Sequence, residues 1–260
     1  MKGAPIASKA LKRTLESIES AVAESNSQVV RIRLLRWAGR HGRSFVWRSW
    51  RDPYRLLVTE ILLKQTRADA VAGVVGQLFG RYPTPQALAV AGHQLEQMIR
   101  PLGLVHQRAA QLRALALVLT DDPPTADYQT QDWRRLPGIG PYAAGMVAAT
   151  LGARRAVAVD TNVARVVCRV FGLVPTHLEA RKSTNVWQKT SDLVSGRSPI
   201  RTLWAVLDLA ALVCIARNPR CQACPLRTVC VVGQQFRPKT GSETSGNPIR
   251  QWSQRASKRT

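Results

Sequence analysis

The sequence predicts an all-α protein. The apolar stretch LLVTEILL runs on into KQTRADAVAGVVGQLF without an internal proline, which is too long for a strand and predicts buried helices. Breaks such as RYPTPQ and GLVPTH are only a few residues long, and no convincing alternation of apolar and polar residues lies between them. Further helices are expected around residues 86–99, 106–119, 142–151, 161–171 and 184–195.

Composition indicates what kind of partner the protein binds. The 260 residues are 45% hydrophobic, which is enough for a real core. Lysine and arginine number 38 against 16 acidic residues, so the formal net charge is +22. A polyanion explains this excess, and an acidic small substrate alone does not. Nucleic acid is the expected partner, ahead of an anionic membrane surface.

The expected location is the cytoplasm, where the protein would associate with the nucleoid through DNA. The N-terminus lacks an uninterrupted apolar segment, and no later stretch approaches the roughly 18 to 20 apolar residues of a membrane span. Four of the five cysteines are crowded into residues 214–230, unlike the framework of a secreted mini-protein. A reducing compartment and a metal site fit this pattern, and no membrane partner is expected.

The two ends of the chain are strongly basic. Residues 31–51 carry seven arginines among aromatic side chains, which could anchor the segment while guanidinium groups reach phosphates. A solvated basic face around buried tryptophans is the alternative. Residues 237–260 are polar and poor in aliphatic side chains, so a disordered basic tail is expected there.

The cysteines point to an iron-sulfur cluster. Cys214, Cys221, Cys224 and Cys230 have the spacing C-x6-C-x2-C-x5-C, which lets four thiolates converge on one [4Fe-4S] cluster. Zinc is the competitor, although zinc sites usually pair two short C-x2-C knuckles across a longer gap. Cys168 has no cysteine neighbour at ligand spacing and is expected in the core.

The segment LPGIGPYAAG, residues 136–145, predicts a helix-hairpin-helix. Gly138, Ile139 and Gly140 form a tight turn whose amides, at the start of the next helix, can hold a DNA phosphate without reading sequence. A simple connection between two helices is the alternative.

Asp160 follows an apolar stretch and precedes an expected helix. It is placed to cap that helix. The helix end would also keep the carboxylate ionised, so that it could stabilise a positively charged sugar or orient water. The two roles are compatible.

The hairpin, the segment AVDTNVARV and the cysteine loop, in this order and spacing, resemble the iron-sulfur DNA glycosylases related to endonuclease III, over roughly residues 52–230. The resemblance implies a two-lobed helix-hairpin-helix glycosylase fold with a C-terminal [4Fe-4S] loop. It also implies that Asp160 is catalytic and supports cleavage through an oxocarbenium-like state after base flipping. The expected domains are an N-terminal region (1–51) packing on the cluster lobe, a six-helix lobe with the hairpin (52–158), the cluster lobe (159–236) and the tail (237–260).

Two residues narrow the resemblance. Tyr142 stands where the endonuclease III-like enzymes have the lysine that forms a Schiff base, so an enzyme without strand-cleaving lyase activity is expected. Tyrosine here resembles the mismatch-specific thymine glycosylases; packing against the hairpin is the alternative. Glu60, an acid in an apolar helix, matches an acid of the thymine and adenine enzymes and is expected to position water or contact the base edge. A partner arginine elsewhere is the alternative for Glu60.

Two further residues match the family's wedges. Gln65 corresponds to the residue that enters the gap left by the flipped nucleotide, and Leu104 to the wedge that faces the opposite strand. Solvent exposure or helix packing would explain them equally well.

We therefore expect a monomeric, monofunctional glycosylase that releases thymine or uracil mispaired with guanine in double-stranded DNA. The rivals are an adenine glycosylase without its C-terminal recognition domain and an endonuclease III-like enzyme for oxidised pyrimidines. A non-catalytic DNA-binding module is the rival of another class.

Overall fold

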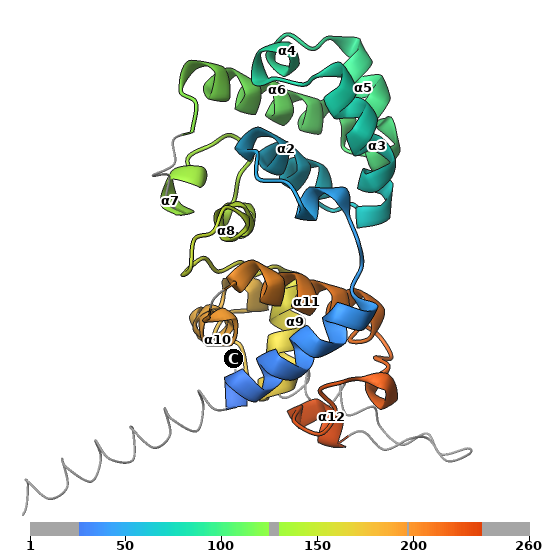
Figure 1. Ribbon diagram of the computed structural model, residues 1–260, viewed down its shortest axis with the longest axis vertical. Coiled ribbons are helices and arrows are strands. Elements are labelled where there is room, and N and C mark those ends of the chain that lie inside the picture. The colour runs from blue at the N-terminus through green and yellow to red at the C-terminus, as the bar shows by residue number, and fades with distance from the viewer. Residues whose placement is uncertain (1–25, 125–129, 197, 236–260) are drawn as a thin grey trace, which may run out of the picture. The chain divides into compact units, whose positions relative to one another are not determined.

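The computed structural model describes residues 26–124, 130–196 and 198–235, and all regular structure in these ranges is helical (Figure 1). The expectation of an all-α fold is confirmed. The basic tail expected over 237–260 lies outside the described residues, as do residues 1–25. Within the described ranges no helix is long and apolar enough to cross a membrane.

The chain divides into two compact units. The first, called here the hairpin unit, comprises Arg43–Asp160 together with Gly196–Leu203. The second, called the cluster unit, comprises the described residues before Arg43, Thr161–Ser195 and the chain from Trp204 onward.

The hairpin unit contains short helical turns and seven α-helices. Helix α2 packs against α3, α6 and α8, and α4 and α5 pack against α6. The elements are η1 (Val46–Arg48), α2 (Pro53–Leu63), α3 (Ala68–Arg81), α4 (Pro85–Ala89), α5 (His93–Ile99), η2 (Arg100–Leu102), α6 (Val105–Asp121), α7 (Thr130–Trp133) and α8 (Pro141–Thr150).

The start of α2 is fixed by local sequence. Asp52 caps the helix by accepting a hydrogen bond from the Tyr54 amide at 3.0 Å, and Pro53 occupies the first turn. The Tyr54 hydroxyl donates to the Tyr82 carbonyl at 2.8 Å, while the Tyr54 ring meets Phe79 edge to face. These contacts tie α2 to the end of α3.

Two expected helical stretches are interrupted. The long apolar run divides into α2 and α3, because the chain leaves helical geometry over residues 64–67, where Gln65 has a φ of 52°. The helix expected over 86–99 divides into α4 and α5, with Gly92 at the start of α5 in an extended conformation that an uninterrupted helix would not allow.

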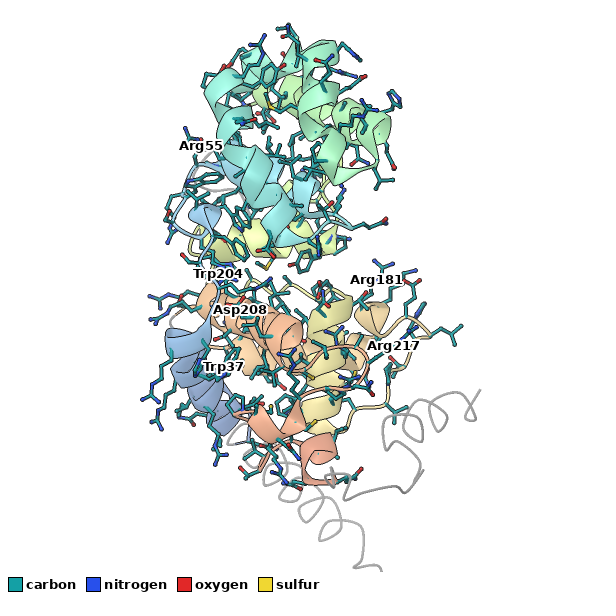
Figure 2. The ribbon with its side chains drawn as sticks, turned by 90° about the vertical axis from the view of Figure 1, so that its right-hand side faces the viewer. Trp37, Arg55, Arg181, Trp204, Asp208 and Arg217 are labelled. Carbon is teal, nitrogen blue, oxygen red and sulfur yellow. The ribbon has the colours of Figure 1, made fainter. Side chains whose placement is uncertain are left out.

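The cluster unit contains a helix over residues 26–41 and the later part of the chain. Its elements are α9 (Thr161–Phe171), η3 (Ala180–Lys182), α10 (Thr184–Val194), α11 (Pro199–Leu212), η4 (Cys221–Ala223) and α12 (Val231–Gln235), the first residues of α11 being counted with the hairpin unit. Helix α11 is not among the helices expected above. Figure 2 labels Trp37 on the first helix and Trp204 and Asp208 on α11; Asp208 is 1% exposed and lies next to Gly42.

Candidate active site and cluster site

The hairpin unit brings together Glu60 of α2, Tyr142 of α8 and Asp160, which immediately precedes α9. Helices α2 and α8 pack against each other, and all three side chains are partly buried. Electrostatic coupling joins them, since Asp160 acts on both Glu60 and Tyr142 and Glu60 acts on Tyr142. These three predicted site residues therefore share one environment, although Glu60 and Asp160 lie far apart in sequence.

Glu60 is a carboxyl whose charged form is disfavoured. Burial, and then the neighbouring Asp160, raise the pKa of Glu60 to about 8, against a smaller opposing effect of Lys64. At neutral pH Glu60 therefore carries a proton and can donate it. A raised pKa of this kind marks carboxyls that act as acids.

Tyr142 lies in the first turn of α8, directly after Pro141. Burial, followed by Glu60 and Asp160, raises the pKa of Tyr142 well above its usual value, while Arg48 and Arg43 oppose the shift. The side chain is thus a neutral phenol. It offers a hydroxyl group and a ring face, and it has no amine.

The position of Asp160 depends on a close approach of backbone to helix. A Cβ added to Gly145 of α8 would lie 1.9 Å from the Val157 carbonyl oxygen, which no real side chain tolerates. Only glycine lets the segment that ends at Asp160 lie directly against α8. Gly145, a helix residue with a high intrinsic cost, is therefore explained by packing beside the site.

The predicted hairpin turn lies between α7 and α8. Gly138 has a φ of +75°, in the left-handed region, and Gly140 is the residue before α8. A Cβ on Gly138 would meet Ile61 Cδ1 at 3.2 Å, so the turn packs directly on α2. Ile139 is 5% exposed and anchors the turn in the core.

The two predicted wedge residues share an unusual backbone. Gln65 and Leu104 have φ values of 52° and 51°, in the left-handed region that non-glycine residues rarely adopt. Both are exposed, Leu104 to 49%, in loops that precede α3 and α6. Strain of this kind is typical of functional loops.

Three basic residues near this site were not predicted. Lys64 acts on Glu60, and its Nζ donates to the Gly138 carbonyl; burial lowers the Lys64 pKa. Arg43 and Arg48 act on Tyr142, and both guanidinium groups lie over the Phe45 ring, at 5.1 and 5.4 Å from its centroid. The richness of residues 31–51 in arginine was the available signal, but the sequence does not show which arginines act on Tyr142.

The aromatic contacts of the basic segment, residues 31–51, agree with both interpretations of it: an aromatic anchor with arginines that reach phosphates, and a solvated basic face around buried tryptophans. The Phe45 ring stacks on buried Trp47 with centroids 4.6 Å apart. Trp50 meets Phe79 edge to face, and Arg55, labelled in Figure 2, lies over both rings according to the distances of 5.7 and 5.6 Å from its guanidinium carbon to their centroids. The aromatic side chains anchor the segment, and its arginines are exposed or only partly buried.

The four clustered cysteines line one pocket of the cluster unit. Cys214 follows α11, Cys221 begins η4, Cys224 directly follows η4, and Cys230 precedes α12. Burial, together with the three neighbouring thiols, raises the pKa of Cys224 to about 12. Iron binding must therefore displace protons from these thiols.

The pocket fits a polynuclear cluster better than zinc. Zinc sites usually pair two short C-x2-C knuckles across a longer gap, whereas the four cysteines here have the spacing C-x6-C-x2-C-x5-C. Four thiols lining one pocket suit a [4Fe-4S] cubane. Cys168, 1% exposed in α9, does not line the pocket.

Two arginines of α9 support the cysteine loop. Arg169, 5% exposed, donates to the carbonyls of Ile215 and Ala216 at 2.8 Å and lies 3.5 Å from the Cys214 sulfur. Arg165 donates to the Cys214 carbonyl at 3.0 Å. A positive charge beside a cluster sulfur is a usual outer-sphere feature of such sites.

Comparison with known proteins identifies related chains. Residues 58–189 match the HhH-GPD superfamily of base excision DNA repair proteins, and residues 214–230 match the iron-sulfur binding domain of endonuclease III. The second match confirms the expected [4Fe-4S] cluster.

Individual relatives include two glycosylases of different specificity. A thymine-DNA glycosylase of Aeropyrum pernix is 31% identical over 214 residues, which cover 78% of this chain and 94% of the relative. An adenine DNA glycosylase of Mycolicibacterium smegmatis is 34% identical over 202 residues, which cover 75% of this chain and 67% of the relative. The solved structure of a thermostable thymine-DNA glycosylase matches with a TM-score of 0.75 and 28% identity, covering 82% of this chain and 98% of that one.

Proposed function

Because the chain belongs to the HhH-GPD superfamily of base excision DNA repair proteins and is a DNA N-glycosylase, we propose that it hydrolyses the N-glycosidic bond of thymine or uracil mispaired with guanine. The observation that carries the proposal is the coupled group of Glu60, Tyr142 and Asp160 in the hairpin unit. The similarity to the thymine-DNA glycosylases over most of both chains supports the substrate.

Asp160 acts on the sugar. As the C1′–N1 bond breaks, its electron pair leaves with the pyrimidine and positive charge develops on the deoxyribose. A carboxylate held beside C1′ stabilises this charge and orients the water that then adds to C1′. The close packing at Gly145 holds the segment before Asp160 rigidly, which favours such preorganisation.

Glu60 acts on the leaving base. With a pKa of about 8 it is protonated at neutral pH and can donate its proton to a carbonyl oxygen of the departing pyrimidine anion. The proton released by the attacking water restores the Glu60 carboxyl. Base and water are thus converted to a free pyrimidine and an abasic sugar, with no net change in the enzyme.

Tyr142 forms part of the base pocket, and the reaction stops at the abasic site. A neutral phenol offers a ring face against a flipped base and a hydroxyl for hydrogen bonding. Since it has no amine, it forms no imine with C1′, and strand cleavage through this position does not occur. Lys64 is engaged with the Gly138 carbonyl, which holds its amine on the hairpin.

The [4Fe-4S] cluster, bound by Cys214, Cys221, Cys224 and Cys230, cross-links the C-terminal loop of the cluster unit and takes no part in the hydrolysis. Arg165 and Arg169 fix that loop to α9 through hydrogen bonds to its backbone. DNA is bound as a duplex, with the hairpin amides on a backbone phosphate, by a monomer of this chain.

Adenine opposite guanine or 8-oxoguanine is the second candidate substrate. It is favoured by the 34% identity with an adenine DNA glycosylase and by Glu60, which could equally protonate a purine. The oxidised-pyrimidine reading is disfavoured by Tyr142.

One set of duplexes decides between these substrates. The purified holoenzyme is incubated with T/G, U/G, A/8-oxoguanine and thymine-glycol duplexes, and each sample is divided before alkali treatment. We expect alkali-dependent cleavage at T/G and U/G. Release of adenine while thymine and uracil survive would refute the substrate assignment, and strand scission before alkali would refute the absence of lyase activity.

A further inference from the structure

A single buried arginine joins the two loops that carry Gln65 and Leu104. Arg108, in the first turns of α6, is 3% exposed. Its Nη2 donates to the Lys64 carbonyl at 2.8 Å and to the Thr66 hydroxyl at 2.9 Å. Its Nη1 donates to the carbonyls of Leu102 and Gly103 at 2.9 and 2.6 Å. Nη2 thus holds the loop of Gln65, and Nη1 holds the loop of Leu104.

These bonds surround the two strained residues. Gln65 stands between the two acceptors of the first loop, and Leu104 directly follows the acceptors of the second. Both have positive φ, a conformation that persists only when the surroundings impose it. The Arg108 guanidinium imposes it on both loops, because its planar fork fixes the direction of each bond.

The same network reaches the hairpin. Lys64, whose carbonyl accepts from Arg108, donates through its side chain to the Gly138 carbonyl in the hairpin turn. The Thr66 hydroxyl, bonded to Arg108, also lies 3.3 Å from the Leu102 carbonyl. Three loops of the hairpin unit are therefore connected through two side chains, Arg108 and Lys64, although the loops come from separate parts of the sequence.

A role in stability alone does not require four hydrogen bonds from one buried arginine to two loops. Ion pairing does not explain a buried guanidinium that donates to backbone carbonyls and a hydroxyl, and burying its charge is costly. The bonds are all directed at loops with exposed tips and not at the core. What they provide is a fixed distance between two exposed side chains.

We propose that Arg108 is the positioning residue that sets the register of the two wedges, Gln65 and Leu104, and thereby lowers the cost of extruding the target nucleotide from the duplex. The inference rests on the proposed function, since wedges matter only to an enzyme that flips a base. Arg108 touches neither the base nor the sugar. Its contribution is therefore confined to substrates in which the base must be extracted from a stacked pair.

The test compares duplex DNA with DNA in which the target needs no extraction. Arg108→Lys keeps the charge and loses the fork; Arg113→Lys is the matched control, because Arg113 lies on the same helix and donates to the Ala91 carbonyl and Glu96 instead. Single-turnover excision at saturating holoenzyme is measured on a U/G duplex and on uracil in a short unpaired bubble. Fluorescence of 2-aminopurine beside the target reports extrusion directly.

We expect Arg108→Lys to slow excision from the duplex by roughly 10- to 100-fold, with a matching loss of the fluorescence change, and to leave bubble excision within about threefold of wild type. The Arg113→Lys enzyme should match wild type on both substrates. Equal losses of Arg108→Lys on both substrates, or no loss on the duplex, would overturn the proposal.

Two further experiments cover the cases in which the Arg108→Lys variant does not fold or the proposed substrate is wrong. Should Arg108→Lys fail to fold, Thr66→Val removes one acceptor at nearly constant volume and should give a smaller loss, again confined to the duplex; a loss on both substrates counts against the proposal. If wild-type enzyme releases adenine and not uracil, the proposed substrate is wrong, and the same comparison with an adenine target then tests Arg108 independently.

Discussion

Replacing Glu60 with glutamine should remove an alkaline limb from the pH profile of base excision. Glutamine keeps the shape of the side chain but cannot donate an acidic proton. With a pKa of about 8, Glu60 is almost fully protonated at pH 7, and only about one molecule in eleven is protonated at pH 9. The wild-type rate constant should therefore fall about tenfold between these two pH values.

The assay is single-turnover excision from a U/G duplex at saturating enzyme between pH 6 and pH 9.5, so that DNA binding does not limit the rate. Glu60→Gln should be slower at pH 7 by about 10²- to 10⁴-fold, the usual contribution of a general acid, and its rate should not change near pH 8. A wild-type rate that is the same at pH 7 and pH 9, or a glutamine variant that keeps the alkaline limb, would refute the assignment of Glu60 as proton donor.

Stability gives an independent check on the same pKa. The folded-state pKa of Glu60 lies above the unfolded value of 4.5, so its contribution is full below pH 4.5 and is lost as the pH rises through about 8. A shift of this size corresponds to about 5 kcal/mol at most, and because the side chain is partly exposed we expect about 2 to 4 kcal/mol. Relative to wild type, Glu60→Gln should therefore gain stability between pH 5 and pH 9, as measured by denaturant unfolding of the holoprotein. A constant difference would place the pKa of Glu60 near its ordinary value.

Three other predictions test separate parts of the molecule. Asp160→Asn should lose turnover on U/G DNA by at least about 10³-fold while its affinity for the mismatch, measured by fluorescence anisotropy, stays within a few fold; a wild-type protein that binds but shows no turnover would instead indicate a non-catalytic module. Gly145→Ala places a Cβ 1.9 Å from the Val157 carbonyl, so it should lower both the melting temperature and the excision rate, whereas alanine at open Gly73 should not lower either. Cys224→Ser should lose iron and visible absorbance, and Cys168→Ala should keep both; equal iron in the two variants would show that Cys224 is not a ligand.

Much of the helical framework follows from local sequence. Helix α9 begins and ends where its amphipathic pattern does, at Thr161 and Phe171, and α6 extends only slightly beyond the expected 106–119. The cysteine spacing likewise predicted the cluster that the family comparison confirms. In these segments the sequence pattern and the observed burial agree, so no tertiary contact is needed to predict them.

Helix α11 could not be predicted in the same way. Its buried residues lie on several sides, as Leu203, Ala205, Val206 and Asp208 show, so the buried positions do not form the single apolar stripe that marks an amphipathic helix. The role of Arg108 could not be predicted either, in this case because the residues around it are polar. Arg108 stands in VHQRAAQLRALALVLTD among other polar residues and would be taken for a solvated surface arginine, because the sequence does not show that the Lys64 carbonyl and the Thr66 hydroxyl, more than 40 residues away, accept hydrogen bonds from it.

The positions that break the usual rules of backbone conformation and apolar patterning are those at which function is expected. Among the described residues, positive φ outside glycine occurs at Gln65, Leu104 and Asn218: the two loops that we propose carry the wedges, and the loop that carries the clustered cysteines. Glu60 breaks the apolar pattern of α2, and an acid whose ionisation is opposed by burial would be removed by selection for stability alone. A domain that only needed to fold could relax each of these features at low cost. Their concentration in loops and in one pocket argues that stability is given up there to hold a DNA-binding and catalytic geometry.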